Sequence, residues 1–233
     1  MIKIRLRFSK SGPLRFIGHL DFLKGFQQTI RRAGLPMAYS QGFNPHMLLS
    51  FAMPLPLGMT SHNDYADITL ESWLTEAELS SRLNKNAPEG LKIIGAWEYD
   101  GPGAAALVTA ADYSLTIERP PETIRDITQA IAESINSLLS RQSIIVPKKT
   151  KSGIKDTDIR QDILDIWPQE GEEESLVMMR LAAGSARFLN PLIVAGLLLG
   201  HDVGPSSIVR IELYRQTKDG SKELSPLYEA PIY

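Results

Sequence analysis

The sequence predicts an α+β fold made of two consecutive βαββαβ units. Apolar residues alternate with basic residues over 2–8, which is the period of a strand with one buried face and one basic face. Apolar side chains then recur at helical spacing over 20–33, and Gly34 and Pro36 end that helix. The same order of strands and helices is predicted again beyond a boundary rich in Gly, Pro and Ala at 101–106.

The first unit is predicted to occupy residues 1–100. A helix is expected over 75–86, because Glu76 and Glu78 in its first turn suit the helix dipole. Residues 37–63 are rich in Gly, Pro, Asn and Ser, and an irregular stretch of this length inside a compact domain is usually functional. The other strands of this unit are expected at 48–52, 65–71 and 91–99.

A linker at 101–111 is predicted to separate this unit from a second one at 112–233. Two such units in tandem make a duplicated ferredoxin-like fold. The elements expected here are strands at 113–117, 144–146, 159–167, 175–182 and 207–214 and helices at 121–139 and 189–199.

Basic residues gather again in the second unit, at Lys149, Lys151, Lys155 and Arg160. An acidic run at 170–174 follows them. We interpret the basic residues as one arm of a hairpin. That arm either contacts a polyanion or protects an exposed strand edge, a role for which Lys is also favoured.

Charge is unevenly divided along the chain, whose net charge is −2. The first 50 residues carry eight Lys or Arg and one acid, so this segment is strongly basic, and the rest of the chain is acidic. A segregated positive field attracts polyanions, and nucleic acid is the first candidate. The alternative is that the basic strand and helix are simply solvated.

Several classes of chemistry are excluded or unexpected. The chain has no cysteine, so it cannot hold a radical SAM cluster or a thiolate zinc site, and it lacks the common nucleotide-binding motifs. No cofactor is expected. No metal site is expected either, because the histidines and nearby acids lack a recognised ligand spacing. We also expect no membrane span and no signal peptide, and hence a cytoplasmic protein.

The densest group of candidate binding residues spans a tight turn and the start of the first helix. Lys10, Gly12 and Arg15 precede His19, and the free amides of a helix N-terminus favour anions. Lys24, on the helix, extends the basic surface. His19 is also a candidate general base, and Asp21 is better explained as a first-turn acid than as its catalytic partner.

A second candidate group lies in the irregular stretch that follows. Ser40, Gly42, Phe43, Asn44 and His46 form a polar loop around one aromatic residue, a composition used when bases stack on aromatic rings. His46 is the second candidate catalytic residue, because it could converge on the same cleft as the first histidine.

Three segments, RLRFSKSGPLRFIGHLD at 5–21, RRAGLPMAYSQGFNPH at 31–46 and SFAMPLPLG at 50–58, resemble the radical SAM-linked proteins. Members of that family of unassigned function are encoded beside, or fused behind, cobalamin-type radical SAM proteins, so the resemblance implies a radical SAM partner. Gly18 stands where the family pattern has a serine. The motif positions implied are Lys10, Gly12, Arg15, Phe16, His19, Asp21, Arg32, Ser40, Gly42, Phe43, Asn44, Pro45, Gly58, Asp158 and Arg160.

These observations predict an RNA-binding accessory protein that works with a radical SAM partner on structured RNA and has no catalysis of its own. Two alternatives remain. One is a metal-independent endoribonuclease, by analogy with CRISPR repeat-processing enzymes of tandem ferredoxin-like architecture. The other is a subunit that docks on the radical SAM enzyme without RNA contact. The residues expected to contact the anion are Arg5, Arg7, Lys10, Gly12, Arg15, His19, Lys24, Arg31, Arg32, Ser40, Gly42, Phe43, Asn44, His46, Lys149, Lys151, Lys155 and Arg160.

Overall fold

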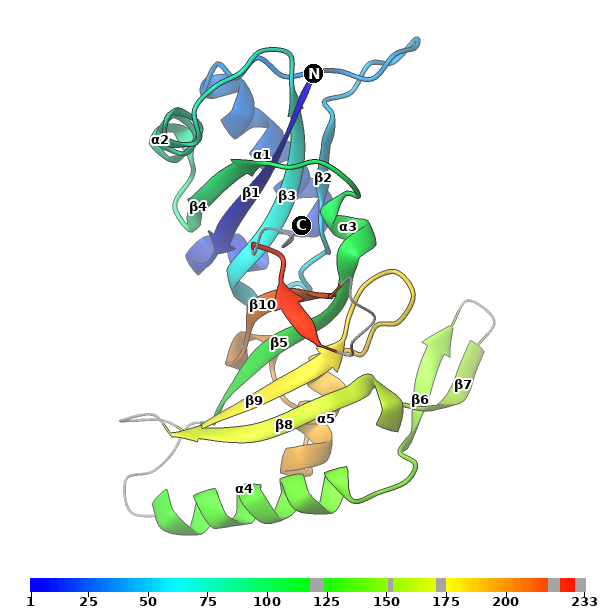
Figure 1. Ribbon diagram of the computed structural model, residues 1–233. Coiled ribbons are helices and arrows are strands. Elements are labelled where there is room, and N and C mark those ends of the chain that lie inside the picture. Colours follow the sequence, from blue (N-terminus) through cyan, green and yellow to red (C-terminus); the bar gives the residue numbers. More distant parts are fainter. Residues whose placement is uncertain (118–123, 151–152, 171–174, 218–222, 229–233) are drawn as a thin grey trace.

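The computed structural model describes residues 1–117, 124–150, 153–170, 175–217 and 223–228. Figure 1 shows two α+β units joined through one sheet. The elements of the first unit are β1 (Ile2–Lys10), the 3₁₀ helix η1 (Gly12–Phe16), α1 (His19–Arg32), β2 (Leu49–Phe51), β3 (Thr60–Leu70), α2 (Glu76–Asn86) and β4 (Leu91–Glu98).

The second unit repeats this order with a hairpin inserted after its first helix. Its elements are α3 (Ala104–Leu107), β5 (Val108–Ile117), α4 (Ile124–Leu139), the hairpin β6 (Ile145–Thr150) and β7 (Gly153–Asp158), η3 (Arg160–Asp162), β8 (Ile163–Glu170), β9 (Ser175–Ala182), α5 (Pro191–Leu199), η4 (Pro205–Ser207), β10 (Ile208–Gln216) and β11 (Leu224–Pro226).

The order of strands in the sheet is β4-β1-β3-β10-β5-β9-β8, with β2 beside β3 and β11 beside β10. Each unit therefore places its fourth, first, third and second strands side by side, which is the ferredoxin-like arrangement. The α+β class and the tandem ferredoxin-like units are as the sequence predicts. The units meet where β10 runs parallel to β3, with Val209 opposite Thr60 and Arg210 opposite Ser61.

Part of the predicted linker at 101–111 is regular structure. The short helix α3 occupies four of its residues, and β5 begins at Val108 rather than at Tyr113. The predicted helix at 121–139 is described from Ile124 onward, and residues 121–123 lie outside the described part of the chain. Residues 171–174 of the acidic run at 170–174 also lie outside it.

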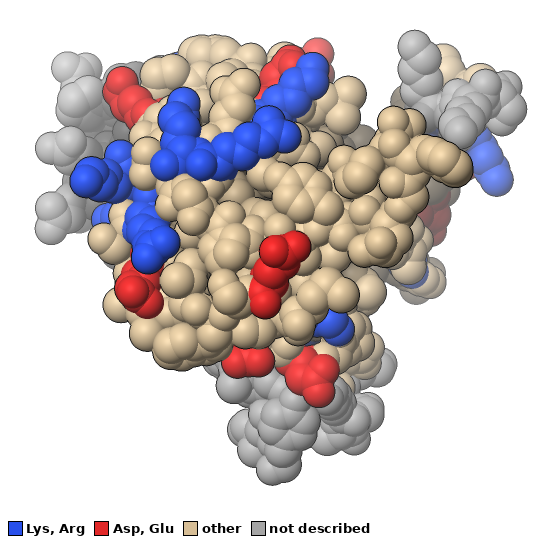
Figure 2. Space-filling model, turned by 90° about the horizontal axis from the view of Figure 1, so that it is seen from above, with Lys and Arg blue, Asp and Glu red and all other residues tan. Residues whose placement is uncertain are grey.

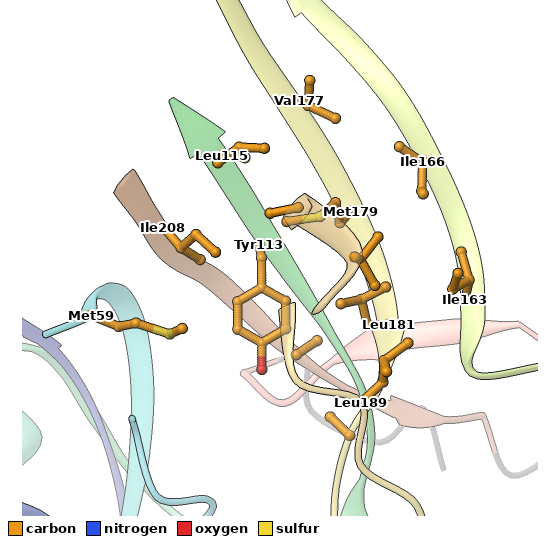
Figure 3. Packing of buried hydrophobic residues seen from close by; sticks show 14 of the residues in the cluster. Met59, Tyr113, Leu115, Ile163, Ile166, Val177, Met179, Leu181, Leu189 and Ile208 are labelled. Carbon is orange, nitrogen blue, oxygen red and sulfur yellow. The ribbon is translucent and has the colours of Figure 1, made fainter. Parts of the chain in front are cut away.

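Each unit has its own apolar core beneath its helices. Ile4, Leu6 and Phe8 on β1 pack under α1 and α2 in the first unit. In the second unit, Tyr113 packs among apolar side chains of β5, β8, β9 and β10 (Figure 3), and residues of α4 and α5 belong to the same cluster. Met59 of the first unit belongs to this second core, so apolar packing also joins the two units.

Local signals explain how the helices begin. Thr75 caps α2 by accepting a hydrogen bond from the Glu78 N–H, while the Glu78 carboxylate accepts one from the Thr75 N–H. Asn190 caps α5 in a related way, and Pro191 follows it at the first helical position. Within the described residues, no helix combines the length and hydrophobicity needed to cross a bilayer.

Candidate functional site

The basic face predicted for β1 is covered rather than solvated. Arg5 is 4% exposed, and its guanidinium donates to both carboxylate oxygens of Asp67 at 2.7 and 3.1 Å. It also donates to the Pro102 carbonyl at 3.2 Å and lies 4.4 Å from the centre of the Tyr99 ring. The connection between the units packs across this face, so the expectation that Arg5 offers a free charge is wrong.

Arg7 lies on the same face and is engaged by the second unit. Its guanidinium donates to the Asn63 side chain at 2.7 Å and lies 3.6 Å from a carboxylate oxygen of Glu212. The Tyr228 ring covers it at 4.3 Å. Arg7 therefore holds the units together, and it is not the solvated cation that the alternating pattern suggested.

Lys10 lies on the core face of β1, because it has the same parity in the strand as Phe8. It is 2% exposed, donates to the Ile17 carbonyl at 3.1 Å and lies 4.8 Å from the centre of the Phe22 ring. Burial lowers the pKa of Lys10, and the nearby Asp64 carboxylate opposes that shift. The prediction that Lys10 forms part of an exposed anion cradle is therefore wrong.

The tight turn after β1 keeps one partly exposed cation. Gly12 opens η1 with a φ of +55°, a backbone conformation that favours glycine. Arg15 lies over the Phe16 ring at 4.7 Å, and its Nε atom is buried without a hydrogen-bond partner among the described residues. Phe16 itself is 66% exposed. Gly18 is the N-cap of α1 and provides no side-chain cap.

The far end of α1 carries exposed basic residues that suit the helix dipole. Arg31 and Arg32 lie in its last turn, and Arg32 donates to the Asn86 carbonyl at 3.0 Å. Figure 2 views this end of the molecule and shows Lys and Arg side chains gathered on one part of it. Lys24 pairs with Asp21 at 3.4 Å in solvent.

The loop at 40–46 projects from the first unit (Figure 1). Ser40 Oγ and His46 Nδ1 lie 2.8 Å apart, and the His46 N–H donates to the same hydroxyl at 3.1 Å. The Ser40 N–H donates to the His46 carbonyl at 2.9 Å, which closes the base of the loop. Gly42 has a φ of +123°, the Phe43 ring is fully exposed, and Asn44 is exposed beside it.

The hairpin β6–β7 projects from the second unit as a separate two-stranded sheet. Lys148 lies directly opposite Lys155, and Lys149 lies opposite Ile154. Lys148 and Lys155 are exposed, and Ile154 is exposed too. Lys151 lies outside the described residues.

Arg160 closes the base of this hairpin and is structural. Its guanidinium donates to the carbonyl groups of Leu139, Arg141 and Ile163 at 2.9 to 3.1 Å, so it satisfies the end of α4. Asp158 accepts hydrogen bonds from two backbone N–H groups, which lower its pKa. The expectation that Arg160 presents its charge to a polyanion is wrong.

A cavity of about 510 Å³ that sequence reasoning missed lies between the two units. One wall is the segment from Phe51 to Pro56, and another is the turn after β9 that contains Gly184 and Phe188. Among the described members of the predicted anion site, only His19 lines it. The lining residues are His19, Phe51, Ala52, Met53, Pro54, Leu55, Pro56, Ala105, Gly184, Ser185 and Phe188.

A buried ion pair supports one wall of this cavity. Arg210, with 0% exposure, donates from Nε to Asp64 at 2.8 Å. Its other nitrogens donate to the carbonyls of Pro54 and Met53 at 3.1 and 3.2 Å. Ser61 donates to the second oxygen of Asp64 at 3.0 Å. Apolar and charged residues alternate over 209–213, and this pattern is the local sequence signal for a strand with one polar face.

The two candidate catalytic histidines have different surroundings. His19 makes an edge contact with Phe51, with ring centres 5.7 Å apart, whereas His46 pairs with Ser40. No hydrogen bond or ring contact joins these histidines in the described residues, so the structure does not bring them together as one catalytic pair. In the same residues, no three His, Asp or Glu side chains are grouped as a metal site.

A family model described as "Uncharacterized protein conserved in bacteria (DUF2344)" matches residues 3–191. The match covers nearly all of the first unit and reaches the start of α5 in the second. The chain belongs to this family. The family description gives no activity for DUF2344 proteins, so their function has to be argued from the residues. No curated protein matches this chain.

Likenesses to solved structures are distant. One is a Cbf5-Nop10-Gar1 complex, with 15% identity and a TM-score of 0.43 over 90% of this chain. This chain spans 48% of the length of the protein matched there. An unknown protein from Galdieria sulphuraria has 13% identity and a TM-score of 0.24, with 85% of this chain and 89% of that one covered. A putative glycine cleavage system transcriptional repressor has 8% identity and a TM-score of 0.23, with 84% and 86% covered. These values carry no argument about function.

Proposed function

We propose that this DUF2344 protein binds RNA as an accessory protein and acts beside a radical SAM protein in the modification or maturation of structured RNA, such as tRNA or rRNA. The observation that carries RNA binding is the pair of projections on one side of the molecule, the 40–46 loop and the β6–β7 hairpin (Figure 1). The radical SAM partner is supported by the sequence resemblance at 5–21, 31–46 and 50–58.

The hairpin supports contact with a polyanion through its lysines. Like charges directly opposite each other destabilise a strand pair, and Lys148 faces Lys155 on a two-stranded ribbon outside the main sheet. A phosphate backbone next to this pair would remove the repulsion and release counterions. The exposed Ile154 provides apolar surface beside them.

The 40–46 loop supports contact with an unstacked base through Phe43. Its ring is fully exposed at the tip of a loop whose base is closed by the hydrogen bonds between Ser40 and His46. A phenylalanine has only two side-chain torsions to order when a base stacks on its ring, and each such stack contributes about 1–3 kcal/mol. Asn44 beside the ring is exposed and could donate to a base edge.

The test of the hairpin is the salt dependence of binding to a fluorescently labelled pool of transfer RNA. We expect log Kd to change linearly with log salt between about 50 and 200 mM, because phosphate contacts release counterions. The double variant Lys148→Ala/Lys155→Ala should lower the slope by about 2. The double variant Lys85→Ala/Lys92→Ala removes two positive charges from another part of the surface. Its slope should stay close to that of the wild-type protein.

The test of the loop is the same titration with Phe43→Ala. Binding should weaken by about 5- to 150-fold, which corresponds to one lost stack, with no change in thermal stability. Trp73→Ala removes another exposed ring and serves as the matched control. A wild-type protein that fails to bind RNA at low salt, or whose slope is near zero, would reject RNA binding.

A second candidate function is docking on a protein partner without RNA contact. Three apolar side chains near the start of α1 favour it, since Phe16, Leu20 and Leu57 are 60–69% exposed. The Gly58 N–H donates to the Arg15 carbonyl at 2.7 Å, which brings the last of these close to the first. Binding of a purified radical SAM protein after nuclease treatment, abolished by Leu20→Asp and kept by Trp73→Asp, would favour this function over RNA binding.

A further inference from the structure

We propose that the cavity between the two units binds a small, mostly apolar molecule with an aromatic ring, and that His19 provides its polar contact. Lys148 of the hairpin donates to the carbonyl of the lining residue Phe188 at 3.5 Å, but the inference does not depend on RNA binding. It rests on the size and lining of the cavity, on the fixed position of its walls and on the surroundings of His19.

The size and chemistry of the cavity define the class of ligand. Its volume of about 510 Å³ falls in the range of roughly 300–1,000 Å³ that buries a drug-sized molecule. Phe51, Met53, Leu55 and Phe188 make its walls mainly apolar. A highly charged ligand would lose its hydration here without compensation, whereas an aromatic ring could make edge or offset contacts with the two phenylalanines.

The walls of the cavity are fixed before any ligand arrives. Arg210 holds the carbonyls of Met53 and Pro54 from β10 of the second unit. On the opposite wall, Gly184 has a φ of +114°, and a Cβ atom there would lie 2.2 Å from the Val108 carbonyl oxygen. Because both walls are ordered by interactions outside the cavity, binding requires little further ordering of the chain.

His19 and Ser185 are the polar side chains that line the cavity, and His19 is the larger of the two. Its ring contacts the edge or face of Phe51, and neither ring nitrogen has a hydrogen-bond partner among the described residues. The same side chain also lines a much smaller inner cavity together with Lys10 and Asp64. A neutral imidazole offers one donor and one acceptor, so the ligand is expected to carry a hydrogen-bonding group at the end that faces His19.

The test uses N-phenyl-1-naphthylamine, an uncharged fluorescent probe with two aromatic ring systems and one N–H group. Fluorescence titration of the wild-type protein should give saturable binding of one probe per chain. Ala105→Phe fills the cavity from α3 and should weaken this binding at least tenfold. Ala106→Phe adds the same ring at the next exposed position of that helix, outside the lining, and should bind like wild type.

A second pair of variants tests the opposite wall, so the proposal can still be tested if Ala105→Phe or Ala106→Phe fails to fold. Ser185→Trp should weaken probe binding, and Ala186→Trp should not, since only the former residue lines the cavity. The probe should also shift the imidazole resonances of His19 in an NMR spectrum and leave those of His46 unchanged. No saturable binding to wild type, equal binding by the members of both pairs, or an unmoved His19 signal would overturn the proposal.

Discussion

The basic residues of β1 and those of the β6–β7 hairpin lie in opposite environments. Arg5, Arg7 and Lys10 are covered by the other elements of the protein and contact carboxylates, carbonyls or rings, whereas Lys148 and Lys155 are exposed on a projecting ribbon. A cation on a strand of this sheet can contact a ligand only if no other element packs on the face to which its side chain points. The comparison teaches that topology, more than the number of charges, decides which cations can meet a ligand.

Each unit has an ion pair between its first and third strands. The arginine lies on the first strand in one unit and on the third strand in the other. Arg5 on the first strand of the first unit lies opposite Asp67 on its third strand. In the second unit the first strand carries the acid, Asp112, and the third carries Arg180. An aromatic residue covers the arginine in each case. The first pair is buried on both sides, whereas the Arg180 side chain is 31% exposed. Arg5 also donates to the Pro102 carbonyl, which places the first pair against the connection between the units.

The largest expected effect separates these two ion pairs. Arg5→Met removes the cation that pairs with the buried Asp67 carboxylate and leaves that carboxylate only neutral donors such as the Ala104 N–H, so we expect it to lower the free energy of unfolding by about 3–5 kcal/mol. Arg180→Met should cost less, about 1–2 kcal/mol, because the Arg180 side chain is 31% exposed and water can replace part of what it donates, whereas each carboxylate keeps one neutral donor. Urea unfolding of both variants measures the difference, and equal losses would break the comparison.

A smaller, pH-dependent effect is expected at Glu212, where the units meet. Burial raises the pKa of Glu212 to about 7 from its ordinary 4.5, although the Tyr65 hydroxyl donates to it at 2.6 Å. The folded protein therefore keeps this proton over a range in which the unfolded chain loses it. The resulting stabilisation, up to about 3 kcal/mol, is complete below pH 4.5 and disappears as the pH rises through 7.

Urea midpoints at about pH 5 and pH 8 test this dependence. The wild-type protein should lose stability between the two values, and Glu212→Gln should lose less, because an amide does not ionise. Glu98→Gln changes an exposed carboxyl and should follow the wild type. If the wild type and Glu212→Gln lost the same amount, ionisation of Glu212 would not be the cause.

The smallest expected effect has the opposite sign and concerns the hairpin. Lys155→Glu replaces a like-charged pair opposite Lys148 with an attractive one, so it should stabilise the ribbon by about 0.2–1 kcal/mol. Slower hydrogen exchange of the Lys148 backbone amide would show this stabilisation. Lys92→Glu makes the same change of charge outside the hairpin and should leave that exchange rate unchanged. Faster exchange would contradict the proposed repulsion.

Most of the fold follows from local patterns, while the availability of the cations does not. The alternation over 2–8 identifies β1, and continued parity already places Lys10 on the same face as Phe8. The covering of Arg5 depends on Asp67, 62 positions away, and that of Arg7 on Glu212 in the other unit. Local composition shows neither partner.

The candidate site also has one part that the sequence predicts and one part that it does not. The 40–46 loop was predictable because Gly42, Phe43 and Asn44 form a local signal for an exposed aromatic turn. The cavity was not, because its walls at 51–56 and 184–188 are far apart in the sequence and meet only through the joined sheet. Such a site depends on long-range pairing that a single sequence does not report.

The most direct test of the central claim is acetylation of lysines in the folded protein, read by mass spectrometry with and without transfer RNA. We predict that Lys10 stays unmodified in both cases, and that Lys148 and Lys155 react in the free protein and are protected by RNA. Rapid modification of Lys10, or protection confined to Lys24 while the hairpin lysines react unchanged, would contradict the account.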